Sequence, residues 1–144
     1  MSMINAGMMS SLSDNWETPQ DFFDQWNAKL GPFETDVCAS ADNAKCAKYY
    51  DLSTDGLSQV WTGKCWMNPP YGRTIGHWMK KAYESSLNGA SVVCLVPART
   101  DTKWWHDFAM KGEYFLIKGR LKFGGHTNSA PFPSAIVFFE GITE

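Results

Sequence analysis

Four consecutive residues, Asn68-Pro69-Pro70-Tyr71, bring together groups that could do chemistry at the end of a predicted strand. The apolar run 65–67 precedes them, and two prolines cannot continue a central strand, so they begin a loop. The asparagine offers an amide oxygen, the prolines hold a backbone carbonyl rigidly, and the tyrosine presents a flat ring. Together these groups can orient an amine and stack on a planar ring. The competing interpretation, a proline-rich turn with an aromatic cap, is weaker because a chance match of four residues at a strand end is rare.

The hydrophobic pattern predicts the elements that position this loop. Three helices are expected, at 18–30, 75–87 and 101–112. Strands are expected at 33–38, 65–67, 91–97, 114–123 and 134–140, the fourth with a bulge at Gly119, and residues 44–50 form either a short helix or a short strand. In the first helix, Thr18 is the expected N-cap and Pro19 the first helical residue, and Gly31-Pro32 ends the helix.

The alternation of strands and helices indicates an α/β fold with a mostly parallel sheet. The run 91–97 is apolar on both faces, as in a buried parallel strand. No helix separates the last two predicted strands, which indicates a terminal antiparallel hairpin. Ligands bind such sheets beyond the carboxyl ends of the strands, so a site is expected in the loops after Cys38, Met67 and Pro97.

Length and composition limit the class of protein. The chain has 144 residues, of which 44% are hydrophobic and 19% charged, enough for one packed domain. We expect a flexible N-terminus at 1–14 and a single domain at 15–144. The apolar runs are far shorter than a membrane span, and residues 1–12 lack the features of a signal peptide. A cytoplasmic protein without a membrane partner is therefore expected.

Metal and covalent chemistry find little support in the sequence. The cysteines at 38, 46, 65 and 94 form no CxxC pair, and the histidines at 77, 106 and 126 lack ligand spacing. We therefore expect no metal and interpret the cysteines as reduced, packed residues. The sequence also lacks the motifs of phosphate loops, dinucleotide-binding folds, zinc proteases and serine hydrolases.

Five segments in a fixed order resemble one known family. They are Trp16-Glu17-Thr18-Pro19, Asp36-Val37-Cys38-Ala39-Ser40, Asn68-Pro69-Pro70-Tyr71-Gly72, Pro97-Ala98-Arg99-Thr100-Asp101 and Gly119-Arg120-Leu121-Lys122-Phe123. Together they are similar to the phage-encoded DNA N-6-adenine methyltransferases, the phage Dam family, from about residue 15 to 140. The Asn-Pro-Pro-Tyr motif alone also occurs in methyltransferases of protein glutamine and RNA guanine, so the ordered set carries the resemblance.

The resemblance implies a minimal, Rossmann-like methyltransferase fold that depends on S-adenosylmethionine and modifies the exocyclic amine of adenine in DNA. Asn68 and the carbonyl of Pro69 would accept the two amine hydrogens and favour the pyramidal nitrogen that attack requires. Pro70 would help to hold that carbonyl in place. Tyr71 would stack on a base turned out of the duplex. The transfer is direct, so no cysteine nucleophile is required.

The resemblance also implies that S-adenosylmethionine is bound mainly by the loop after the first predicted strand. Asp36 would interact with the ammonium group of the cofactor, or it caps its own turn. The glycines usual in this loop are replaced here by Ala39 and Ser40. Asp55 would contact the cofactor's adenine, or it is a turn residue, and either Asp42 or Asp51 could bind the ribose. The expected cofactor-binding residues are Thr18, Pro19, Asp36, Cys38, Ala39, Ser40 and Asp55.

DNA is the implied partner, and the charge distribution agrees better with it than the net charge of −2 does. Residues 1–72 hold 4 basic and 9 acidic side chains, whereas residues 73–122 hold 9 basic and 4 acidic ones. The candidate phosphate contacts are Arg99, Lys103, Arg120 and Lys122. Phe123 either forms a wall of the base pocket or packs in the core. Target recognition is expected from the loops 72–77, 99–105 and 124–133, without a separate domain.

Two alternatives remain open at this point. One is an amino-methyltransferase that acts on RNA or on protein glutamine, and the other is a non-catalytic, DNA-binding relative. The presence of Asn68 and Tyr71 disfavours the second. The resemblance places the protein in a bacterial host cell, encoded by a phage or prophage, and the sequence leaves its oligomeric state open.

Overall fold

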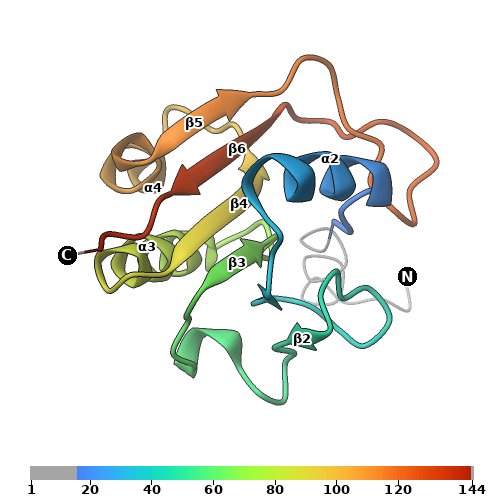
Figure 1. Cartoon of the computed structure of the whole chain (residues 1–144). Helices are drawn as coiled ribbons and strands as arrows, with labels where there is room; N and C mark the ends of the chain where they lie inside the picture. The colour runs from blue at the N-terminus through green and yellow to red at the C-terminus, as the bar shows by residue number, and fades with distance from the viewer. Residues whose placement is uncertain (1–15, 144) are drawn as a thin grey trace, which may run out of the picture.

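The computed structural model describes residues 16–143, which form one six-stranded sheet with helices on both faces (Figure 1). The expected loose segment 1–14 lies outside this range. The strand order is β2-β1-β3-β4-β6-β5. In that order the bounds are Lys48–Tyr49, Thr35–Asp36, Lys64–Met67, Ser91–Pro97, Ser134–Phe139 and Glu113–Leu116.

The sheet is mostly parallel and ends in an antiparallel hairpin, as the sequence predicts. Strands β2, β1, β3 and β4 pair in parallel, and β6 runs antiparallel to both of its neighbours, β4 and β5. Because β6 is inserted between β4 and β5, the strand β5 points the same way as β4. This arrangement confirms the expected α/β class and agrees with a small methyltransferase fold.

Helix α2 (Gln20–Leu30) covers one face of the sheet. Its apolar residues fall on one side, where Phe23 meets the ring of Trp66 edge-on at 5.1 Å between ring centroids. Trp26 packs against Phe115 of β5 at 5.2 Å. The helix ends at Gly31, whose N–H donates to the Asn27 carbonyl. A Cβ at this glycine would lie 2.5 Å from that carbonyl oxygen, so a side chain has no room there.

The other face is covered by helices α3 (Ile75–Leu87) and α4 (Lys103–Asp107). Tyr83 of α3 contacts Phe139 of β6 at 5.9 Å, and Trp105 of α4 contacts Tyr114 of β5 at 5.7 Å. Two short 3₁₀ helices, η1 (Gly56–Ser58) and η2 (Ala109–Lys111), complete the described elements. Between the two helical layers, every residue of β4 after Ser91 is buried, which explains why that strand is apolar on both faces.

Several predicted boundaries need correction. Strand β1 holds only two of the residues 33–38, and the open choice at 44–50 resolves as the strand β2. The third predicted helix is divided into α4 and η2. Residues 121–123 are not a strand, because the chain leaves the sheet after Leu116 and pairs elsewhere.

The cap of α2 also differs from the prediction. Pro19, not Thr18, holds the N-cap position, and no side chain of residues 16–143 caps the helix. The hydroxyl of Thr18 instead accepts a hydrogen bond from the side chain of Asn68. A tertiary partner has therefore replaced the local one that the sequence favours.

Candidate functional site

The predicted site loops lie along one edge of the sheet. Strands β1, β3, β4 and β5 all point toward this edge, so the loops 37–47, 68–74, 98–102 and 117–133 leave the sheet there. A bridge between Glu17 and Gly124 brings the segment before α2 to the same place. Its hydrogen bond, from the N–H of Gly124 to the carbonyl of Glu17, is 2.9 Å long. Ligands of open α/β sheets bind at this edge.

Asn68 directly follows β3, and residues 50 and 52 positions earlier hold its side chain. Its Nδ2 donates to the carbonyl of Trp16 and to Oγ1 of Thr18, the latter at 2.9 Å. A carbonyl oxygen only accepts hydrogen bonds, so the amide nitrogen must face Trp16 and Oδ1 must point away. Oδ1 is buried and has no hydrogen-bond partner among the residues that the structure describes. The site thus contains a buried acceptor that lacks a donor.

The next three residues of the motif are largely enclosed. Pro69 is fully buried, and Pro70 is half-buried. Tyr71 is only 3% exposed, and its hydroxyl donates to the carbonyl of Leu95 in β4 at 3.2 Å. Burial raises the pKa of this hydroxyl well above its usual value, so the phenol stays protonated and keeps its role as a donor.

The ring of Tyr71 belongs to an aromatic cluster formed by Trp16, Tyr71, Phe123, His126 and Phe132. Phe132 lies 5.6 Å and Phe123 6.2 Å from the tyrosine ring, both edge-to-face. Trp16 stacks on His126 at 4.2 Å and also meets Phe123 and Phe132 edge-on. The structure therefore places Tyr71 beside Phe123, which is itself buried in the core, and both phenylalanines that contact the tyrosine ring come from the loop 117–133.

Asp36 ends β1 beside the Asn68 loop, since it pairs in register with Trp66. Its carboxylate is 3% exposed and accepts from the N–H of Cys38 at 3.3 Å and of Lys45 at 3.0 Å. Burial raises the pKa of Asp36 to about 6, against the lowering effect of these two bonds and of the Lys45 charge. Asp36 therefore caps its own loop, which was the alternative role. Its oxygens retain lone pairs for one more donor.

The remaining residues of this loop form its frame. The backbone N–H groups of Ala39 and Ser40 are already bonded, to the Tyr50 carbonyl and to Asn43 Oδ1. These two residues can therefore shape a ligand pocket but not donate from their backbone. Cys38 is half-buried, and burial raises the pKa of its thiol to about 12, so the sulfur is a neutral surface rather than a nucleophile.

Asp55 lies close to this loop although seventeen residues of sequence separate it from Val37. The contact is made by its neighbour: a Cβ at Gly56 would be 2.1 Å from the carbonyl oxygen of Val37. Asp55 itself is exposed and has a left-handed backbone with φ of 54°. Asp51 accepts hydrogen bonds from Ser53 and Thr54, and the first of these is the main cause that lowers the pKa of its carboxyl. Asp51 is thus engaged within its own turn.

The four predicted phosphate contacts lie near the same edge and are all exposed. Arg99 and Lys103 follow β4, and Lys103 forms an ion pair with Asp107 one helical turn later. Arg120 and Lys122 belong to the loop after β5, where Arg120 Nη1 donates to the Ala130 carbonyl at 3.4 Å. Arg120, Lys122 and Pro19 line a hollow of about 380 Å³ between that loop and α2.

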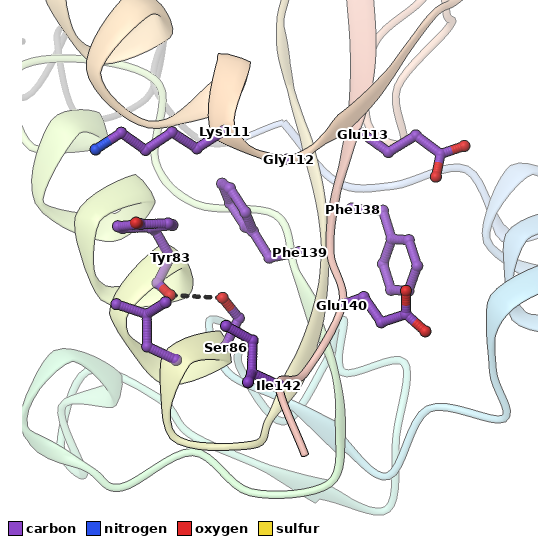
Figure 2. Close-up of a pocket in the computed structure, with 10 residues that line it drawn as sticks. Tyr83, Ser86, Lys111, Gly112, Glu113, Phe138, Phe139, Glu140 and Ile142 are labelled. Atoms are coloured by element: carbon purple, nitrogen blue, oxygen red, sulfur yellow. Dashed lines mark hydrogen bonds between the residues drawn. The ribbon is translucent and has the colours of Figure 1, made fainter. Parts of the chain in front are cut away.

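A second hollow, of about 400 Å³, lies at the opposite edge of the sheet (Figure 2). Lys111, Glu113 and Glu140 carry charges around it, and Tyr83 and Phe139 line it between them. It contains no predicted site residue. Within residues 16–143, no group of three or more potential ligands could hold a metal ion, and no helix is long and apolar enough to cross a membrane.

Three residues contribute to the site in ways that the sequence does not predict. The Trp16 carbonyl binds Asn68, and His126 and Phe132 complete the aromatic cluster. Trp16 belongs to the family-like segment Trp16-Glu17-Thr18-Pro19, so the sequence does place it near the site. His126 and Phe132 lie in a turn-rich loop without periodicity, and no local pattern reveals their contacts.

Comparison with known proteins gives a consistent result. Residues 6–142 match the family described as DNA N-6-adenine-methyltransferase (Dam). The chain is 33% identical over 98 residues to a DNA N-6-adenine-methyltransferase of Escherichia phage T1, covering 66% of this chain and 40% of that protein. It is 28% identical over 151 residues to a protein of the same name from Haemophilus phage HP1, covering 96% of this chain and 85% of that protein. The chain thus spans less than half of the T1 relative and most of the HP1 relative.

Proposed function

The chain belongs to the DNA N-6-adenine-methyltransferase (Dam) family of enzymes, and from this membership we propose that it transfers a methyl group to the exocyclic amine of adenine in DNA. The observation that carries the proposal is the buried Oδ1 of Asn68 at the end of β3, which has no hydrogen-bond partner within residues 16–143. An adenine amine supplies the N–H donor that this oxygen lacks.

The residues beyond β1 suit S-adenosylmethionine as the methyl donor. Asp36 is a buried carboxylate whose proton affinity is raised by burial, and a nearby ammonium group would relieve that cost. Gly56 packs directly against the Val37 carbonyl, where a Cβ would lie 2.1 Å from the oxygen, and this close contact brings Asp55 to the loop. Asp36, Cys38, Ala39, Ser40 and Asp55 would hold the donor, with Pro19 at its margin. When bound, this cofactor supplies an electrophilic methyl group on a sulfonium.

The chain's own residues prepare the adenine nitrogen. The amine lone pair is delocalised into the ring, so the nitrogen is a poor nucleophile until its geometry changes. Asn68 Oδ1 and the carbonyl of Pro69 would each accept one amine hydrogen and draw the lone pair out of conjugation. Because both acceptors are fixed before the base arrives, little reorganisation is needed during the reaction. As the bond from this nitrogen to the methyl carbon forms, the bond from that carbon to the donor's sulfonium sulfur would break, and the amine would release one proton to solvent.

The base must reach Asn68 outside the duplex, and the aromatic cluster supplies surfaces for it. Tyr71 and Phe123 would stack against the flipped adenine once Phe132 moves off the tyrosine ring. Arg99, Lys103, Arg120 and Lys122 would contact phosphates around that opening. We propose that target recognition comes from the loops at this edge and that the protein acts in a bacterial host cell.

Methyl transfer from radiolabelled S-adenosylmethionine to DNA, RNA and protein fractions tests the proposal. We expect label in DNA, at N6 of adenine, and a loss of at least about a hundredfold in the Asn68→Ala variant with unchanged donor affinity. Label in RNA or in protein glutamine, with none in DNA, would reject adenine methylation and support the alternative substrate class. Wild-type activity in Asn68→Ala would remove this residue from the mechanism.

A matched control for Asn68→Ala is Asn88→Ala. Asn88 ends α3 and donates only to the Glu84 carbonyl through its exposed side chain, at 3.2 Å. The two substitutions delete the same amide, but only one of them removes the buried acceptor. We expect Asn88→Ala to transfer methyl groups at the wild-type rate.

A further inference from the structure

We propose that Thr18 is a positioning residue that fixes the Asn68 amide so that Oδ1 faces the substrate amine. This role differs from the cofactor contact that the sequence suggests for Thr18, and it rests on the proposed adenine methylation. It follows from the hydrogen bonds of one side chain, the amide of Asn68, and from the way the segment 16–18 is anchored.

The donor capacity of the Asn68 amide is fully used. Its Nδ2 carries two hydrogens, one of which goes to the Trp16 carbonyl and the other to Oγ1 of Thr18. Two partners on one nitrogen define both the rotation of the amide about its bond and which end is oxygen. The single polar atom left over is Oδ1, buried and without a partner among the described residues.

The segment that provides these partners is itself held firmly. Thr18 is 5% exposed, and the neighbouring Glu17 accepts the hydrogen bond from Gly124 across the loop 117–133. Trp16 is fixed by its stack on His126. The threonine thus lies between the anchored residues 16–17 and the start of α2, and its hydroxyl can act as a template for the amide.

The hydrogen bond from Asn68 Nδ2 to Thr18 Oγ1 fixes the orientation of the amide. With the Trp16 carbonyl alone, the amide plane can still swing about a single bond. If the Asn68 amide swings, Oδ1 moves away from the substrate amine. If the amide turns over, its NH₂ group faces the amine, which is also a donor. Loss of the hydroxyl is therefore expected to slow the chemical step without weakening the donor site.

The experiment compares Thr18→Val, which keeps the shape but removes the acceptor, with Thr18→Ser, which keeps an acceptor. Under single-turnover conditions at saturating S-adenosylmethionine, we expect Thr18→Val to lower the rate of adenine methylation about tenfold, the effect of one hydrogen bond. Thr18→Ser should restore most of that rate. The donor dissociation constant, measured separately by calorimetry, should stay within about twofold of the wild-type value in both variants.

Ser91→Ala is the matched control. It deletes a hydroxyl that accepts from the N–H of Gly141 at 2.9 Å, at the opposite edge of the sheet. The rate of this variant should equal the wild-type rate. If Thr18→Val does not fold, Thr18→Cys takes its place, since a thiol of similar size is a much weaker acceptor.

A second readout needs neither donor nor DNA. In the free protein, exchange of the two Asn68 side-chain amide hydrogens with solvent is followed by NMR, with the signals assigned by their disappearance in Asn68→Ala. Both hydrogens should exchange slowly in the wild type and in Thr18→Ser, and at least one should exchange faster in Thr18→Val.

The outcomes separate this inference from the function it rests on. A wild-type protein that methylates no adenine would refute the proposed function, while the exchange rates would still test the amide contact. An active wild type with an equally fast Thr18→Val would overturn the positioning role. So would a variant whose donor affinity falls while its rate at saturation is unchanged, since Thr18 would then act on the cofactor.

Discussion

At the scale of single residues, buried polar groups distinguish this site from the surrounding core. Asn68 has a buried acceptor with no donor in the described part of the chain, Asp36 is a carboxylate shielded from solvent, and Tyr71 places a hydroxyl against a strand carbonyl. The first two arrangements cost folding free energy that an apolar residue would not cost, whereas the hydroxyl of Tyr71 is satisfied by its hydrogen bond. The cost is concentrated where a charged donor and a polar base would bind.

The raised pKa of Asp36 predicts a specific dependence of stability on pH. Because the pKa is about 6 in the folded protein and near 3.8 when unfolded, the folded state holds the proton more tightly between these values. The contribution of Asp36 to the free energy of unfolding is therefore greatest below about pH 4 and declines as the pH rises to about 6, by up to ~3 kcal/mol. Urea denaturation across this range, compared with Asp36→Asn, measures the decline.

Asp36→Asn is the reference for the wild type because it has no group that titrates at this position. Its constant cost, from the lost acceptor for the Lys45 N–H, shifts the whole curve without changing its slope. Curves that run parallel between pH 4 and 6 would show that Asp36 has an ordinary pKa in the folded protein.

The Tyr71→Phe substitution separates the ring from the hydroxyl. It removes the bond to the Leu95 carbonyl, which then lacks this donor, and we expect a loss of about 1 kcal/mol in the free energy of unfolding. Methylation should remain within a few-fold of wild type, since stacking needs only the ring. Tyr71→Ala, which removes the ring, should lower the methylation rate far more. Equal losses of rate in both variants would assign the effect to the hydroxyl instead.

At the scale of elements, α2 is coupled to the sheet by large aromatic contacts. Trp26 is buried and packs on Phe115 of β5, so one helix residue joins the first element to the edge of the hairpin. We expect Trp26→Ala to lower the free energy of unfolding by about 3–5 kcal/mol, measured by denaturant titration. Leu52→Ala, at a fully exposed side chain, should change it by less than about 0.5 kcal/mol. A similar small change in Trp26→Ala would show that α2 is not part of the cooperative core.

The elements also show how far the sequence can predict this structure. Helix α3 and strands β4 and β6 agree with the predictions because each is long and its apolar pattern is complete. Residues 121–123 have the apolar pattern of a strand but lie in the loop 117–133, where the N–H of Ala130 donates to the Leu121 carbonyl. The bond between Thr18 and Asn68 spans 50 positions, and local pattern favours a helix cap for Thr18. Contacts of this kind depend on the finished fold, and a single sequence does not encode them locally.

At the scale of the whole molecule, the position of the charged side chains matters more than their sum. The formal net charge is −2, yet Arg99, Lys103, Arg120 and Lys122 are exposed near the edge that carries Asn68. DNA affinity should therefore be moderate and fall steeply with salt, because each neutralised phosphate releases counterions.

The size of that salt effect can be measured residue by residue. In the double variant Arg120→Gln, Lys122→Gln we expect the slope of log affinity against log salt to become shallower by about 2. The control Lys29→Gln, Lys64→Gln removes the same charge from the end of α2 and the start of β3, and it should leave the slope unchanged. Equal slopes in all three proteins would show that Arg120 and Lys122 do not contact DNA phosphates.

The insertion of β6 between β4 and β5 has a consequence for the order in which the molecule can assemble. During synthesis, β5 emerges from the ribosome before its partner strand β6 exists, and the edge of β4 stays open until residues 134–139 follow. The loop 117–133, which covers Tyr71, is tethered at its far end by that same late strand. A nascent chain that stalls before residue 134 therefore exposes an apolar strand edge and lacks a closed active site, which makes it a natural substrate for chaperones and proteases.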